Sequence, residues 1–104
     1  MSTKRLGILE QMTQAGSRDP FVWYGLAMEY RSLSRNDEAF ATFRRLKEID
    51  ASYVPMYLMC SQLLADMDKL ELARAWIAEG IAIAAGKGDA HAAAELEDAA
   101  RRLE

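Results

Sequence analysis

Apolar residues recur along the chain at helical spacing, and the same register returns after 34 residues. Large apolar and small residues lie three, four and seven positions apart, which places them on one face of an α-helix. Each such run is followed by a segment in which an alanine stands four residues before a large apolar residue. The shared slots hold Trp23, Leu26, Ala27, Tyr30, Ala39 and Phe43 in one copy and Tyr57, Cys60, Ser61, Leu64, Ala73 and Ile77 in the next. The pattern therefore predicts two copies of a two-helix unit.

Turn and capping residues mark where these helices begin. Asp19 precedes Pro20, and this pair favours a helix start. The Asp side chain accepts a hydrogen bond from the first turn, and Pro lacks an N–H group that would be unpaired there. The other residues expected to cap helices are Ser2 or Thr3, Asn36, Asp68 and Asp89.

These signals together predict an all-α chain of about six helices. The segment Gly86-Lys87-Gly88 is expected to stop the fifth helix, because glycine readily adopts the left-handed conformation found just past a helix end. The expected helices cover about residues 3–15, 20–33, 37–49, 54–67, 69–85 and 90–103, and no segment has the pattern of a strand.

The period and the residue classes resemble the tetratricopeptide repeat, which follows the pattern W-x2-L-G-x2-Y…A-x3-F over two helices. The resemblance implies an α-solenoid of antiparallel helix pairs, in which each pair leaves a face for the next pair to cover. It also implies one domain over residues 1–104. The expected parts are an N-terminal cap helix at 1–19, repeats at 20–53 and 54–87, and a C-terminal capping helix at 88–104.

Small residues in this pattern have a packing role. Two helix axes approach to about 8–10 Å only where small side chains meet, and Ala39 and Ala73 supply such side chains on the second helix of each pair. Gly80 conforms to the family at a further small position. Leu46 departs from it, since a large residue stands in the corresponding slot of the first copy.

Composition and charge narrow the classes of function. The formal net charge is −3 and no basic patch runs along a predicted face, so the chain lacks the electrostatic footprint of a nucleic-acid-binding protein. Gly7 and Glu10 interrupt the N-terminal apolar stretch, which is too short for a signal peptide or a membrane span. Cys60 is the only cysteine, which suits a reducing compartment. We therefore expect a cytoplasmic protein without a membrane or nucleic-acid partner.

The sequence offers little material for catalysis. His91 is the only histidine, and one histidine with a distant Cys60 does not have the spacing of a zinc site. We expect His91 to be exposed and Cys60 to be a buried, inert thiol. The chain has no phosphate-binding loop, nucleophile elbow or cluster of metal-binding carboxylates. It is therefore expected not to be an enzyme and to have no catalytic residue, metal or cofactor.

The resemblance to the tetratricopeptide repeat also implies a groove that binds a partner protein. In tetratricopeptide repeat proteins the first helix of each pair lines a concave groove that holds a partner's peptide or helix. A carboxylate clamp of the chaperone type is not expected, because several of these slots are apolar or neutral here. The groove slots hold Phe21, Tyr24 and Met28 in the first copy and Pro55, Leu58 and Gln62 in the second. The residues expected to bind the partner are Phe21, Tyr24, Met28, Leu58 and Gln62, with Arg31 and Asp66 as polar candidates near the far end of the same stripe.

The sequence thus favours an adaptor that binds a peptide or amphipathic helix of another protein in an apolar groove. One alternative is that the first or last helix covers the groove residues, which would make them core. A second is a homo-oligomerisation module, in which the same surface or Trp76 pairs two copies into a homodimer. A third is an accessory subunit with no separate ligand.

Overall fold

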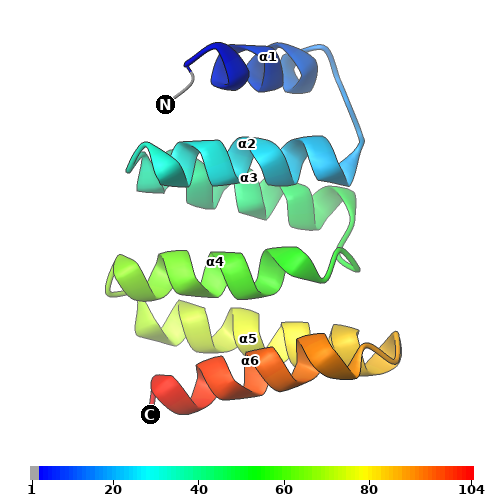
Figure 1. Ribbon diagram of the computed structural model, residues 1–104, viewed down its shortest axis with the longest axis vertical. Coiled ribbons are helices and arrows are strands. Elements are labelled where there is room, and N and C mark those ends of the chain that lie inside the picture. Colours follow the sequence, from blue (N-terminus) through cyan, green and yellow to red (C-terminus); the bar gives the residue numbers. More distant parts are fainter. Residues whose placement is uncertain (1–2) are drawn as a thin grey trace. The chain divides into compact units, whose positions relative to one another are not determined.

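The computed structural model describes residues 3–104, which contain six α-helices and no strand. The chain divides between Ala51 and Ser52 into two compact units. Each unit contains three helices joined by short loops, and consecutive helices within a unit run antiparallel (Figure 1). The helices are α1 (Thr3–Gln14), α2 (Pro20–Ser32) and α3 (Asn36–Ile49) in the first unit, and α4 (Pro55–Asp66), α5 (Leu70–Gly86) and α6 (Ala90–Arg102) in the second. The predicted all-α helical repeat is confirmed, and each helix end lies within one residue of its expected position.

Two of the predicted helix caps are confirmed. Asp19 precedes α2, and its carboxylate accepts a hydrogen bond from the Phe21 N–H at 3.0 Å. Asp89 precedes α6 and accepts one from the Ala92 N–H, also at 3.0 Å. Both side chains satisfy backbone donors that have no partner inside the helix. Thr3 is the first helical residue of α1, while Ser2 lies outside the described residues.

The capping roles expected for Asn36 and Asp68 are wrong. Asn36 is already the first residue of α3, and the cap position before α5 belongs to Lys69. Asp68 instead adopts a left-handed conformation with φ of 60°, and so does Ser34 before α3. In both turns the next N–H group bonds back five residues to a helix carbonyl, at 2.9 Å from Arg35 and 2.8 Å from Lys69. The polar residue therefore closes the preceding helix rather than opening the next one.

In the first unit, α2 and α3 share a buried core that includes Leu26, Ala27, Ala39, Phe43 and Leu46. Trp23, which the pattern assigns to this core, is only half-buried. Its indole N–H donates to the Ser17 carbonyl at 2.7 Å, because the ring lies beside the loop that enters α2. Trp23 therefore ties the α1–α2 loop to α2 and fills the core less than expected.

Helix α1 packs on a different face of α2. The Tyr30 hydroxyl donates to the Glu10 carboxylate at 2.7 Å, and Arg5 pairs with Glu29 at 3.1 Å. The Leu9 side chain comes within 3.6 Å of where a Cβ on Gly25 would stand, so the small residue gives α1 room at this crossing. These contacts define the side of α2 that α1 occupies.

In the second unit, every shared slot of the repeat is buried, from Tyr57 on α4 to Ile77 on α5. Helix α6 adds Leu96, which is also fully buried. The Trp76 ring lies 5.8 Å from the Tyr57 ring in a tilted arrangement and keeps 5% of its surface exposed. The suggestion that Trp76 pairs two copies is therefore wrong, because the ring is already buried in the single chain.

Candidate partner-binding surfaces

An apolar strip runs along α2 beside the face that α1 occupies. Phe21, Tyr24 and Met28 stand three and seven positions apart, so they share one side of the helix. Phe21 is 67% exposed, and the other two are half-buried. The Tyr24 ring meets the Phe43 ring edge-on at 6.4 Å. Tyr24 is thus anchored by its own helix pair while part of its side chain remains accessible.

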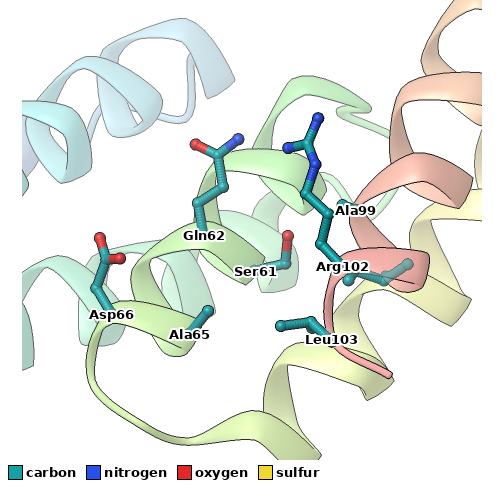
Figure 2. Close-up of a pocket in the computed structure, with 8 residues that line it drawn as sticks. Ser61, Gln62, Ala65, Asp66, Ala99, Arg102 and Leu103 are labelled. Carbon is teal, nitrogen blue, oxygen red and sulfur yellow. The ribbon is translucent and has the colours of Figure 1, made fainter.

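In the second unit the predicted residues Gln62 and Asp66 line a pocket between α4 and α6 (Figure 2). The pocket has a volume of about 160 Å³. Its predominantly apolar lining includes the side chain of Ile77 from α5. Ser61 also contributes, but its hydroxyl donates to the Leu58 carbonyl at 2.8 Å and is already satisfied. The remaining lining residues are Ala65, Ala99, Arg102 and Leu103.

Opposite charges stand at the rim of this pocket. Asp66 is the exposed last residue of α4, and Arg102 is the exposed last residue of α6. Arg102 forms an ion pair with Asp98, one turn earlier on its own helix. Figure 2 shows the Gln62 and Arg102 side chains extending to the same side of the pocket, with Asp66 one turn further along α4. The pocket therefore combines an apolar floor with an acidic and a basic group at its mouth.

A second hollow of about 340 Å³ lies between α5 and α6. Its lining includes Ile81 and two arginines, and the Arg74 guanidinium is held by the Glu71 carboxylate at 3.0 Å and the Leu103 carbonyl at 2.9 Å. Arg101 pairs with Asp98 at 3.4 Å. The sequence pattern did not indicate this hollow, because its residues come from faces that only the placement of α6 brings together.

The seven predicted site residues fall into two sets, one in each unit. Phe21, Tyr24, Met28 and Arg31 belong to α2, where Arg31 is half-buried. Leu58, Gln62 and Asp66 belong to α4, and the pocket gathers the last two but not Leu58. The contributions of Ala99, Arg102 and Leu103 were missed. Their spacing at the end of α6 fits one helix face, but the sequence does not say which neighbour that face meets.

The side chains considered for chemistry lie apart from these surfaces. Cys60 is a buried thiol, as expected. His91 has an exposed side chain whose ring nitrogen lies 3.5 Å from a Glu95 carboxylate oxygen, also as expected. Among residues 3–104 no cluster of three or more histidine, cysteine or acidic residues could hold a metal ion. No helix in the described part of the chain is long and apolar enough to cross a membrane.

The strongest pKa shift belongs to the contact between α1 and α2. Burial, followed by the hydrogen bond to Glu10, raises the pKa of Tyr30 to about 12. On the surface, the hydrogen bond to Arg35 lowers the pKa of Glu38 below its ordinary value. The first shift arises where α1 meets α2, and the second arises in a local pair at the start of α3. Neither group belongs to the strip on α2 or lines the pocket.

Comparison with solved structures identifies the fold family. A solution NMR structure of a tetratricopeptide repeat domain protein from Salinibacter ruber is 34% identical, covers 83% of this chain and 87% of its own, and has a TM-score of 0.79. A crystal structure of a tetratricopeptide repeat domain protein from the same organism is 33% identical over 82% of this chain and 94% of its own, with a TM-score of 0.76. A protein from Bordetella parapertussis, 24% identical, shares the fold with a TM-score of 0.82 over 99% of this chain and 89% of its own.

No protein-family model matches the chain, and no curated protein matches it either. The 34-residue period, the buried small residues at the helix crossings and the likeness to the Salinibacter ruber proteins agree with one another. The chain belongs to the tetratricopeptide repeat family.

Proposed function

We propose that this chain is a protein-interaction adaptor that binds a peptide or an amphipathic helix of another protein. The observation that carries the proposal is the apolar strip of Phe21, Tyr24 and Met28 on α2, in which Phe21 is 67% exposed. A large aromatic side chain gains free energy when it leaves water, so a partner that covers Phe21 is favoured.

The chemistry of the strip suits an interface. Aromatic residues supply the anchor contacts that dominate the binding energy of many protein complexes. Met28 has an unbranched, polarisable side chain that can repack around different partners. The edge-on contact with Phe43 fixes Tyr24 before binding, which reduces the conformational entropy that a partner's arrival would remove.

The residues on α4 extend the proposal to the second unit. Leu58, Gln62 and Asp66 are assigned to partner binding, together with Arg31 on α2. Membership in the tetratricopeptide repeat family supports a binding role, and the proposal includes no catalytic step, metal, cofactor or nucleic acid. The single cysteine supports a reducing, cytoplasmic setting.

A phage-displayed library of random peptides tests this proposal on the immobilised chain. We expect enrichment of peptides with two or more large apolar residues, because a groove of this kind binds its partner through a few apolar anchor residues. The same selection on a Phe21→Ala, Met28→Ala variant is expected to lose these peptides. A selection that enriches nothing on the wild-type chain contradicts the proposal, and so does enrichment of the same peptides on both chains.

Self-association is the second candidate. Ile8 and Met12 stand one turn apart on α1 and are 49% and 42% exposed, so they offer an apolar face that a second copy could cover. Sedimentation equilibrium over a range of concentrations tests this directly. A dimer that Ile8→Lys disperses would support self-association, while a monomer at every concentration would exclude it in favour of the adaptor.

A further inference from the structure

The pocket between α4 and α6 has the features of a specificity site. We propose that it receives one apolar side chain of the partner segment, and that Asp66 and Arg102 select a basic residue on one side of that anchor and an acidic residue on the other. This inference rests on the proposed function, since it names the chemistry of the partner that the adaptor binds.

The size and lining of the pocket suit a single side chain. A cavity of about 150 Å³ lined by apolar residues is large enough to hold a benzene molecule. The volume here is about 160 Å³, with Ala65, Ile77, Ala99 and Leu103 among the lining residues. Ligand pockets for whole drug-sized molecules are larger, at about 300–1,000 Å³. The pocket therefore suits a leucine, methionine or phenylalanine side chain and is too small for a drug-sized molecule.

The acidic side of the mouth has two sources of negative potential. Asp66 ends α4, where the backbone carbonyls already give the helix terminus a partial negative charge. The last turn of α4 contains no basic residue to offset them. A carboxylate also offers more acceptor positions than one partner occupies. A lysine or arginine of the partner is therefore favoured beside Asp66.

The basic side of the mouth belongs to Arg102. Its guanidinium carries five N–H donors, and its ion pair with Asp98 occupies only part of them. The side chain is 72% exposed, which leaves room for a second carboxylate. Gln62 extends beside Arg102 and offers an amide donor and acceptor to the backbone of an extended segment (Figure 2). An aspartate or glutamate of the partner is therefore favoured on this side.

Charge reversal tests the assignment with peptides that the library selection yields on the wild-type chain. Those peptides are expected to share an apolar residue with a basic residue on one side and an acidic residue on the other. Asp66→Lys is expected to weaken their binding by up to about fivefold at low salt, since exposed ion pairs are modest and screened. Replacing the peptide's basic residue with glutamate is expected to restore binding to Asp66→Lys. Arg102→Glu is likewise expected to weaken peptide binding, and replacing the peptide's acidic residue with lysine is expected to restore it.

Matched controls separate a local effect from a change in net charge. Glu97→Lys is the control for Asp66→Lys, and Arg44→Glu is the control for Arg102→Glu. Each control makes the same change in charge at an exposed position outside the pocket lining. Both controls are expected to bind the selected peptides like the wild-type chain. Ala65→Leu is expected to abolish binding by filling the pocket, whereas Ala78→Leu, in the hollow between α5 and α6, is not.

Each result has one interpretation. Equal losses for Asp66→Lys and Glu97→Lys, or selected peptides without flanking charges, overturn the pocket assignment. If peptides are enriched and need Phe21 and Met28 but ignore every pocket variant, the adaptor proposal stands and the pocket assignment falls. If no peptide is enriched, both fall. A dimer of the free chain that Asp66→Lys disperses would assign the pocket to a second copy, which also overturns the inference.

Discussion

Gly80 on α5 faces Tyr57 on α4 with no room for a side chain. A Cβ atom added at Gly80 would stand 2.5 Å from the Cβ atom of Tyr57, closer than nonbonded carbon atoms approach each other. The same added atom would lie 3.0 Å from a methyl group of Leu96 on α6. All three helices of the second unit therefore meet at this one glycine, and the fit depends on its missing side chain.

Gly80→Ala is therefore expected to destabilise the chain. Alanine improves helix propensity by about 1 kcal/mol over glycine, but overpacking a close crossing costs about 1–3 kcal/mol. The atom in conflict is a Cβ, which can move only with its backbone. Gly7→Ala is the control, because a Cβ at that helical position meets nothing within 4 Å. Denaturant unfolding should show a lower free energy of unfolding for Gly80→Ala and a higher one for Gly7→Ala. A higher free energy of unfolding for both variants would refute the tight crossing.

Ala39→Leu and Ala73→Leu are expected to lower stability by about 1–3 kcal/mol each. Both alanines are fully buried where the two helices of a pair cross. Ala41→Leu and Ala75→Leu make the same change at exposed positions of α3 and α5, where surface substitutions shift stability by about 0.5 kcal/mol or less. Equal denaturation midpoints for all four variants would show that the crossings tolerate larger side chains.

Tyr30 links stability to alkaline pH. Its pKa is raised to about 12 in the folded chain, above the ordinary value of 10.0, so folding favours the neutral phenol. The stability that Tyr30 contributes through this shift is fully present below about pH 10 and is lost as the pH rises towards 12. Tyr30→Phe removes both the titration and the hydrogen bond to Glu10, and should cost about 1 kcal/mol at neutral pH. Chemical denaturation at several pH values should show a flatter alkaline profile for this variant; an unchanged profile would contradict the assignment.

The helices and much of the core could be predicted because their signals are local. A 34-residue register of large and small residues fixes which face of each helix is buried, and the buried positions of Ala39, Ala73 and Gly80 follow from it. The helix caps were harder to predict, because the same polar residues favour both a helix start and a left-handed turn. At Asp68 the turn prevailed, since the Lys69 N–H closes the preceding helix.

The pocket could be predicted only in part, because it depends on where α6 packs. Helix α5 has 17 residues whereas α3 has 14. The 34-residue period therefore does not predict which positions beyond α5 face the rest of the unit. Gln62 corresponds to Met28 in the repeat register, and Asp66 lies one turn further along the same helix, so both could be placed on this face; Arg102 and Leu103 lie beyond the two repeats. The burial of Trp76 was missed because Trp76 is not one of the repeat slots, although the Tyr57 ring that it contacts is.

The central claim is that the strip on α2 binds a partner segment, and the affinity of a library-selected peptide for matched variants tests it most directly. Phe21→Ala with Met28→Ala should weaken binding by about 2 kcal/mol or more while leaving the melting temperature nearly unchanged. Ile8→Ala with Met12→Ala removes similarly exposed apolar surface from α1 and should leave the affinity unchanged. Equal affinities of the wild-type chain and the Phe21, Met28 variant would contradict the account, as would an equal loss in the α1 control.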